Sequence, residues 1–325
     1  MEKIAVIPAY EPNDKMIHLL SELKENNYII IVVNDGSNKS YDNIFQIAKK
    51  YATVLKHDKN KGKGSALKTA FSYIKNKYSS YCVITIDCDG QHKVSDANKL
   101  YEYLINHENQ LVIGKRKRLK STPLRSRIGN SITRFIYFIS SGIDVYDTQT
   151  GLRAFTNKIM DFMLQIDGQR YEYEMNMLLY SPINNIIIKE IEIETIYYDN
   201  NSNSHFSTLK DSYKIYKQII KFSSISIISF ILDYLLYIFF NISTKKLELS
   251  NILSKLISSI VKYNLNKKRV FKNIILYFIY VICILIINTI MLNIAVNYFS
   301  INIYLSKIII ELMIFIVSFC IKKYQ

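Results

Sequence analysis

The chain has 325 residues and a formal net charge of +15, and 49% of its residues are hydrophobic. Its length allows more than one domain, because single hydrophobic cores usually stop growing below about 250 to 300 residues. The charge would suit a nucleic-acid partner, but the sequence resembles no helix-turn-helix, zinc finger or aromatic RNA platform, so nucleic-acid binding is not expected.

Short β-rich runs alternate with helical patterns in the first part of the chain. Strands are predicted at residues 3–7, 29–33, 53–56, 83–86 and 111–113. Helices, with apolar residues at spacings of three and four, are predicted at residues 15–25, 41–49, 64–77 and 95–106. This alternation predicts an α/β domain whose mostly parallel sheet carries helices on both faces. Ligands of such sheets bind beyond the carboxyl ends of the strands.

Polar segments follow three of these strands: "PAYEP" the first, "NDGS" the second and "DCDGQH" the fourth. In the last of them, Asp87 and Asp89 would point to the same side, because side chains along a strand alternate. As surface residues they would need no ligand, but the preceding run "YCVITI" indicates a buried strand. A divalent cation, with the Gln91 amide and the His92 imidazole nearby, would turn their repulsion into binding. Mg²⁺ or Mn²⁺ commonly bridges such carboxylates to phosphates, so the pattern predicts a nucleoside diphosphate site.

Two glycine-containing segments have simpler interpretations. "VVNDGS" is typical of a strand that ends in an ordinary Asp-Gly turn. "NKGKGSALKTAF" resembles a helix start that cradles phosphate. It lacks the spacing of a Walker loop, and no G-x-G-x-x-G follows the first strand, so nucleotide binding by those two routes is not favoured.

From about Phe222 the chain is mostly Ile, Leu, Phe, Tyr and Val. Spanning helices, which need about 20 apolar residues, are predicted at residues 222–240, 249–265, 274–298 and 303–321. With four spans, most of the lysines and arginines of the tail share one face, which the positive-inside rule places in the cytoplasm. No cleavable signal precedes the first strand, so the large domain is expected in the cytoplasm too.

Six segments occur in the order seen in family 2 glycosyltransferases: "VIPAYEP", "VVNDGS", "NKGKGSALKTAF", "DCDGQH", "GKR" and "DTQTGLRAF". They resemble most the dolichyl-phosphate mannose synthase and bactoprenol glucosyltransferase branch. The tail resembles the GtrA-like membrane family, chiefly through "VKYNLNKKRVFKN". The resemblance implies a GT-A, Rossmann-like catalytic domain at residues 1–218 and an α-helical, four-span transmembrane domain at residues 219–325.

The resemblance also implies roles for individual residues. Those that would bind the nucleotide sugar are Pro8, Ala9, Tyr10, Glu11, Asp35, Lys63 and Asp87. The ligands of Mg²⁺ or Mn²⁺ would be Asp87, Asp89 and Gln91. The catalytic set would be Asp89 with Arg116 and Arg127, because the planar guanidinium grips phosphate with two donors. Lys63 is equally typical of a solvated face in so lysine-rich a chain.

A lipid acceptor would meet the residues next to the membrane. Residues 125–143 suit an interfacial helix, although a buried helix beneath the site would look similar. Candidates for contact with a lipid phosphate are Arg125, Arg134, His205 and Lys210. The last two are also typical of a polar turn beside a membrane. Glu172 and Glu174 are two further candidates for a functional role, but exposed charges on a helix explain them almost as well.

The expected function is a membrane-bound, inverting hexosyltransferase. It would move a hexose from a UDP- or GDP-sugar to polyprenyl phosphate at the cytoplasmic face, and homo-oligomers are a further expectation. The acceptor oxygen is already anionic, with a second phosphate pKa of about 6, so no strong general base is required. A saccharide or protein acceptor, which would need such a base, is one alternative. A glycolipid translocator or scaffold whose transferase domain only binds is another.

Four ionisable residues of the tail lie at membrane depth, where charge is costly: Asp233, Lys255, Lys307 and Glu311. They would form either a polar path for a glycolipid head or interhelical pairs that fix the bundle. A role in lipid handling or oligomeric assembly is favoured.

Overall fold

The computed structural model describes residues 1–116, 131, 133–135, 137, 138, 141, 143–194, 208–266 and 274–323. The chain divides into two compact units. The first comprises Met1–Ile136 and Val145–Gln218, and the second comprises Tyr137–Asp144 and Ile219–Gln325. The Arg125, Arg127 and His205 side chains, for which phosphate contacts are predicted, lie outside the described residues.

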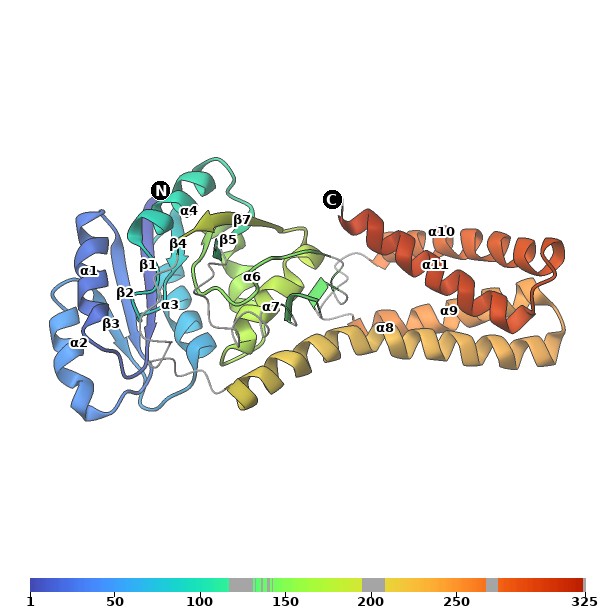
Figure 1. Ribbon diagram of the computed structural model, residues 1–325, viewed down its shortest axis with the longest axis horizontal. Coiled ribbons are helices and arrows are strands. Elements are labelled where there is room, and N and C mark those ends of the chain that lie inside the picture. Colours follow the sequence, from blue (N-terminus) through green and yellow to red (C-terminus); the bar gives the residue numbers. More distant parts are fainter. Residues whose placement is uncertain are drawn as a thin grey trace. The chain divides into compact units, whose positions relative to one another are not determined.

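The first unit is built on a seven-stranded sheet of order β3-β2-β1-β4-β6-β5-β7 (Figure 1). The strands are β1 (Glu2–Ala9), β2 (Ile29–Asn34), β3 (Thr53–Lys56), β4 (Tyr81–Thr85), β5 (Gln110–Arg116), β6 (Arg153–Thr156) and β7 (Ile187–Ile193). The pairs β1–β2, β1–β4, β2–β3 and β5–β7 are parallel, whereas β6 is antiparallel to β4 and β5. The predicted mostly parallel sheet is therefore confirmed. The strands β6 and β7 were not predicted.

Helices cover both faces of this sheet because its central strands are apolar on both sides. The helices are α1 (Lys15–Glu25), α2 (Asp42–Ala48), α3 (Lys63–Lys77), α4 (Val94–Ile105), α6 (Met160–Gln165) and α7 (Glu172–Tyr180). Ala5 and Ile7 of β1 share a core with α1, α2 and α4, while the alternate residues Ile4 and Val6 belong to the other face. On that face α3 contacts β1, β2, α6 and α7. The four predicted helices agree with α1 to α4 within two residues at each end.

The antiparallel strand β6 decides what lies beside the end of β4. Because β4 and β6 run in opposite directions, the carboxyl end of β4 meets the residues just before β6. Thr85 is paired with Arg153, and the Thr85 hydroxyl donates a hydrogen bond of 2.8 Å to the Gly151 carbonyl. The segment "DTQTG" is thereby brought next to Asp87.

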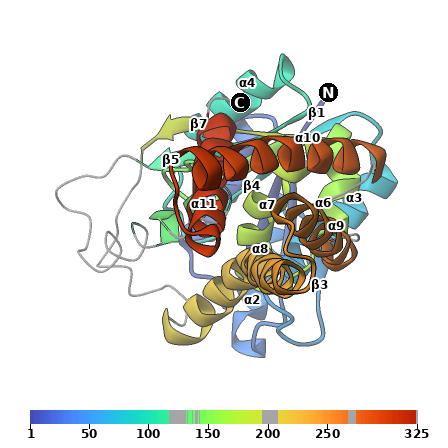
Figure 2. The same ribbon diagram turned by 90° about the vertical axis from the view of Figure 1, so that its right-hand side faces the viewer.

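The second unit contains helix α8 (Thr208–Thr244) from Ile219 onward. It also contains the helices α9 (Leu247–Asn266), α10 (Ile274–Asn293) and α11 (Ile303–Lys323), and a short π-helical turn, η5 (Ile294–Tyr298) (Figure 2). Helix α10 packs against both α9 and α11. Among the described residues, two stretches are long and apolar enough to cross a membrane, Ile227–Thr244 and Tyr277–Tyr298. The tail is therefore helical as predicted, and four membrane crossings stay a prediction.

Candidate active site at the carboxyl edge of the sheet

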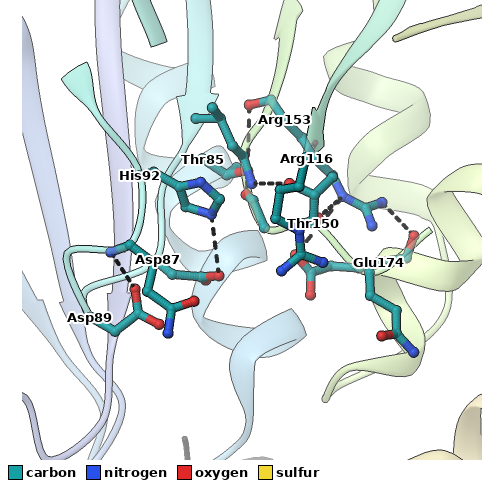
Figure 3. Close-up of polar contacts among 12 residues, drawn as sticks. Thr85, Asp87, Asp89, His92, Arg116, Thr150, Arg153 and Glu174 are labelled. Carbon is teal, nitrogen blue, oxygen red and sulfur yellow. Dashed lines mark hydrogen bonds and ion pairs between the residues drawn. The ribbon is translucent and has the colours of Figure 1, made fainter. Parts of the chain in front are cut away.

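Asp87 follows β4 and lies in a tight polar setting (Figure 3). Its Oδ1 is 2.7 Å from the Lys63 Nζ, and its Oδ2 is 4.0 Å from the His92 Nε2. A Cβ atom added to Gly151 would lie 2.1 Å from the Asp87 Oδ2, so only glycine leaves room for this carboxylate. Burial favours a higher pKa for Asp87, but the neighbouring basic side chains, chiefly Lys63, together outweigh burial and lower the pKa.

Lys63, the first residue of α3, points its ammonium at two carboxylates. Besides Asp87, its Nζ is 3.0 Å from the Glu174 Oε1, in the first turn of α7. Only 14% of the Lys63 side chain is exposed, so the interpretation as a solvated face is wrong. Burial alone would lower the pKa of Lys63, but the Asp87 and Glu174 carboxylates raise it above its ordinary value. Lys63 therefore carries its positive charge into the site.

Arg116 ends β5 and is held by Asp147, which precedes β6. The Arg116 Nε and Nη2 donate to the two carboxylate oxygens of Asp147 at 2.6 and 2.9 Å. Asp147 is fully buried, and its backbone N–H donates to the Glu190 carboxylate at 3.0 Å. Burial would raise the pKa of Asp147, yet the Arg116 guanidinium lowers it. This bidentate pair fixes the direction of the Arg116 side chain.

Arg153 is a second arginine of the site, and it is 1% exposed. Its Nη1 donates to the Glu174 carbonyl at 2.5 Å, and its Nε donates to the Thr150 carbonyl at 3.0 Å. Its Nε is also 4.0 Å from the Glu174 Oε1. Arg153 thus ties the start of β6 to α7, with donors directed at backbone carbonyls.

Asp89 differs from the other carboxylates of the site in its surroundings. Its Oδ1 accepts the Gln91 backbone N–H at 3.0 Å, and no basic side chain of the described residues forms an ion pair with it. Burial and then the charge of Asp87 raise the pKa of Asp89 to about 6. His92 adds no positive charge, because burial lowers its pKa to about 4. Among the described residues, Lys63, Arg116 and Arg153 pair with Asp87, Asp147 and Glu174, and the negative charge of Asp89 is in surplus beside these pairs.

The oxygen ligands at this edge are compatible with a hard cation whose remaining ligands come from water or substrate. No group of three or more His, Cys, Asp or Glu side chains is placed to hold a metal within the described ranges. Mg²⁺ commonly uses one or two carboxylates together with phosphate oxygens and water. The carboxylates of Asp87 and Asp89 with the Gln91 amide match that smaller set.

The predicted nucleotide residues lie at or just beyond the carboxyl ends of β1 and β2, which are adjacent. Ala9 is paired with Asn34, and the Asp35 N–H donates to the Ala9 carbonyl at 2.9 Å. Glu11 has a φ of 49° and donates its N–H to the Ser37 hydroxyl at 2.8 Å. The structure thus brings the predicted residues Pro8, Ala9, Tyr10, Glu11 and Asp35 to one corner of the edge.

Asp35 is buried and bonded to other parts of the protein. Its two oxygens accept the backbone N–H groups of Lys61 and Gly62 at 2.9 and 2.8 Å, and its Oδ1 lies 2.7 Å from the His57 Nδ1. These bonds fix the loop that leads into α3. The predicted hydrogen bonds from a base or sugar to Asp35 stay a prediction.

The glycines at the start of α3, Gly62 just before the helix and Gly64 as its second residue, are explained by a neighbouring loop. A Cβ atom on Gly64 would lie 2.5 Å from the Tyr173 Cβ and 2.9 Å from the Arg170 carbonyl oxygen. The Ser65 N–H, at the start of α3, donates to the Gln169 carbonyl at 2.9 Å. Close packing of this loop therefore accounts for the glycines of "GKG" and takes up one donor of the helix start.

Comparison with known families decides the assignment. Residues 4–167 match the model of glycosyl transferase family 2, and residues 221–325 match that of the GtrA/DPMS transmembrane domain. The chain belongs to glycosyl transferase family 2. The predicted combination of this family with a GtrA-like tail is confirmed.

Several known proteins resemble this family 2 chain. The UDP-N-acetylglucosamine–dolichyl-phosphate N-acetylglucosaminyltransferase of Methanococcus voltae is 32% identical over 218 residues, which cover 59% of this chain and 84% of that protein. The dolichyl-phosphate beta-glucosyltransferase of Saccharomyces cerevisiae is 26% identical over 220 residues, or 58% and 65% of the two chains. The mannosyl-3-phosphoglycerate synthase of Rubrobacter xylanophilus is 16% identical, with a TM-score of 0.51 over 68% of this chain and 73% of that chain, and shows the fold alone.

The predicted lipid-contact residues of this glycosyltransferase are only partly described. The guanidinium carbon of Arg134 lies 4.8 Å from the centre of the Tyr146 ring. Lys210 belongs to α8, and its side chain is outside the described set. A lipid-phosphate role for these two residues, as for Arg125 and His205, stays a prediction.

Two residues of this edge were missed from the sequence. Arg153 lies inside the quoted motif "DTQTGLRAF" but was given no role. For Glu174 a functional role was left open beside the interpretation as an exposed helix charge. That interpretation is wrong for Glu174, whose side chain is 9% exposed and faces Lys63. The available signal was the apolar surrounding of "YEYEMNMLL", which places a glutamate on the buried side of a short helix.

Proposed function

We propose that this family 2 glycosyltransferase moves a hexose, plain or N-acetylated, from a nucleoside diphosphate sugar to a polyprenyl phosphate, with inversion at the anomeric carbon. Two relatives whose names specify dolichyl phosphate support this acceptor, as does the GtrA/DPMS tail. The observation that carries the donor side is the surplus negative charge on Asp89, at the edge where sheets of this kind bind ligands.

A divalent cation is part of the proposal. Asp89, with Asp87 and Gln91, would hold Mg²⁺ or Mn²⁺, which when bound neutralises charge on the departing diphosphate. The surplus charge and the raised pKa of Asp89 support this assignment, because a cation would relieve both. Asp87 is partly neutralised by Lys63 already, so Asp89 is the stronger ligand of the two.

The basic side chains complete the environment of the leaving group. Lys63 and Arg116 are each oriented by carboxylates, so their positive charges are in place before the substrate arrives. Fixed charges of this kind stabilise a transition state in which negative charge gathers on the diphosphate. The predicted role of Arg127 in gripping phosphate is part of the same proposal.

The acceptor explains why no general base is needed. A phosphate monoester oxygen is anionic near neutral pH, because the second pKa is about 6. It can attack the anomeric carbon opposite the leaving diphosphate, and the bond that forms as the C–O bond to diphosphate breaks has the inverted configuration. In this proposal the site residues bind and orient, and no side chain has to remove a proton.

The tail would hold the catalytic unit where the acceptor is found. Its described apolar stretches suit a lipid surrounding, and its lysine-rich ends predict that the catalytic unit lies on the cytoplasmic face. Membrane anchoring, help in handling the glycolipid and formation of homo-oligomers are further parts of this proposal.

The test uses the full chain purified in detergent. Labelled UDP-glucose, UDP-N-acetylglucosamine and GDP-mannose are each incubated with polyprenyl phosphate and Mn²⁺ or Mg²⁺, and the organic-soluble product is identified. We expect one donor to give a lipid-phosphate sugar, and we expect Asp89→Asn or excess chelator to abolish it. The exposed residue Asp161 supplies the matched control, Asp161→Asn.

Two results would overturn parts of the proposal. Transfer to a soluble saccharide or protein, with none to the lipid, would refute the acceptor. Undiminished transfer by Asp89→Asn or in excess chelator would refute the metal site while leaving the acceptor intact.

A further inference from the structure

Lys63 lies between two carboxylates that come from different elements. Asp87, after β4, is 2.7 Å from its Nζ, and Glu174, from α7, is 3.0 Å from it. Glu174 in turn meets the buried Arg153 guanidinium through its carbonyl at 2.5 Å and its Oε1 at 4.0 Å. The four side chains thus alternate in charge from the carboxyl end of β4 to the start of β6. Figure 3 shows three of them, Asp87, Glu174 and Arg153.

Each member of this row is confined by its surroundings. Asp87 is pressed against Gly151, where a Cβ atom would lie 2.1 Å from the carboxylate. Lys63 is the first residue of α3, and the start of this helix is fixed by the hydrogen bond from the Ser65 N–H to the Gln169 carbonyl. The exposed fractions of the Lys63 and Glu174 side chains are 14% and 9%. A charge so far from water persists only when it is paired, and Lys63 and Glu174 are paired with each other.

We propose that Glu174 is a positioning residue of the donor site, which acts through Lys63 and does not touch the substrate. Glu174 draws the Lys63 ammonium into one place, and the ammonium then holds the Asp87 carboxylate against Gly151. Asp89 is left as the carboxylate that carries surplus charge. This role rests on the proposed function, because the donor site is where its effect is measured.

Loss of Glu174 should change the affinity for the donor more than that for the acceptor. In Glu174→Gln the side chain keeps its size and loses its charge, so Lys63 is no longer held from the α7 side. Removing a partner that orients a binding group typically costs about 10- to 100-fold. We expect a fall of that size in kcat/KM for the nucleotide sugar, carried largely by KM, with KM for polyprenyl phosphate unchanged. A smaller folded fraction would instead lower kcat alone.

The matched control lies in the same helical turn. Glu172 accepts the backbone N–H groups of Gln169 and Arg170 at 3.1 and 3.2 Å, and forms no ion pair with a basic side chain in the described part of the chain. Glu172→Gln removes the same charge from the start of α7 and keeps an acceptor oxygen. We expect its donor KM to stay within about 2-fold of wild type.

A double-mutant cycle shows whether Glu174 acts through Lys63. We expect Glu174→Gln to have no further cost, or to restore some activity, in the Lys63→Met background, because its partner charge is already gone. Costs that multiply in the double variant would overturn the role, as would a Glu174→Gln variant equal to Glu172→Gln. A wild-type chain that forms no lipid-linked sugar would overturn the proposed function and this role with it. An active wild type with an unaffected Glu174→Gln overturns this role alone.

Discussion

The two units of the chain distribute polar and apolar side chains in opposite ways. In the first, Ile4, Val6 and their neighbours fill the interior, and charges gather at the edge of the sheet. In the second, Asn251, Asn288 and Lys307 are fully buried, whereas Phe239 is 61% exposed. Water drives the first arrangement, because burial of apolar surface is favourable there. An apolar exterior around a polar interior is stable where the surrounding solvent is lipid.

Charge balance distinguishes the polar groups of the two units. In the tail, the Lys307 Nζ lies 2.9 Å from the Asp233 Oδ2 and 3.0 Å from the Glu311 Oε1. The Lys255 Nζ lies 3.4 and 2.5 Å from the same two oxygens. Two lysines therefore balance two carboxylates across α8, α9 and α11, and the Asn288 amide of α10 donates to Glu311. At the sheet edge, by contrast, Asp89 forms no ion pair with a basic side chain of the described residues, which is why we proposed a cation there.

The largest effect is expected from breaking the balance in the tail. Lys307→Met would leave two buried carboxylates with one lysine, and breaking a buried pair costs about 3 to 5 kcal/mol. We expect a correspondingly lower resistance of the detergent-solubilised chain to unfolding. Asp233→Asn added to Lys307→Met restores one charge of each sign and should recover part of the loss. A double variant less stable than Lys307→Met would show that these charges do not act as one balanced cluster.

The next effect concerns the close fit at the sheet edge. Gly151→Ala would place a Cβ atom 2.1 Å from the Asp87 Oδ2 and force the carboxylate to move. A displacement of about 1 Å in an active site can cost about 100-fold in rate, so we expect a loss of that order in sugar transfer.

Gly114→Ala is the control for this prediction. Its added Cβ would meet the Ile193 Cδ1 at 2.6 Å, which is the end of a flexible side chain that can shift. We expect a smaller loss of activity there, measured together with thermal unfolding of both variants. Equal losses in the two variants would contradict a specific role for the space beside Asp87.

Much of the first unit could be predicted because its strands are continuous apolar runs. The segments that form β1, β2 and β4 are buried on both faces, and such runs stand out in the sequence. β6 could not be found this way, because its four residues include Arg153 and Thr156. β7 alternates in part between apolar and charged residues. This pattern is typical of a strand, but it was not used to predict one.

The site was predicted where one segment contains the chemistry, and missed where distant segments meet. Asp87, Asp89 and Gln91 lie within five consecutive residues, so their type and spacing indicate a binding site without any knowledge of the fold. The contact between Lys63 and Glu174 depends on how α3 and α7 pack, which no local pattern reveals. The same reasoning applies to the four ionisable residues of the tail. Their position at membrane depth marked them as unusual, but only the packing of the helices shows which of them pair.

A moderate effect is expected from the Arg116–Asp147 pair, and it depends on pH. The pKa of Asp147 is lowered in the folded chain, so its ionised form stabilises the fold above the ordinary aspartate pKa of 3.8. That contribution is lost as the pH falls below 3.8 through the lower folded-state pKa. We expect Asp147→Asn to unfold more easily than wild type at pH 7, with the difference narrowing in acid. A difference that stays constant from pH 7 to strongly acidic pH would contradict the pairing.

The smallest effect is expected at the surface of the first unit. The Lys75 Nζ lies 2.5 Å from the Asp161 Oδ1, as close as the Lys255–Glu311 contact in the tail, but the two side chains are 48% and 70% exposed. Water already solvates both charges, so an exposed pair of this kind contributes between about 0 and 1 kcal/mol. We expect Asp161→Asn to leave the unfolding midpoint within error of wild type. The difference between the two should be smaller still at high salt. A loss as large as that of Lys307→Met would mean that distance alone, and not the surrounding solvent, determines what these contacts are worth.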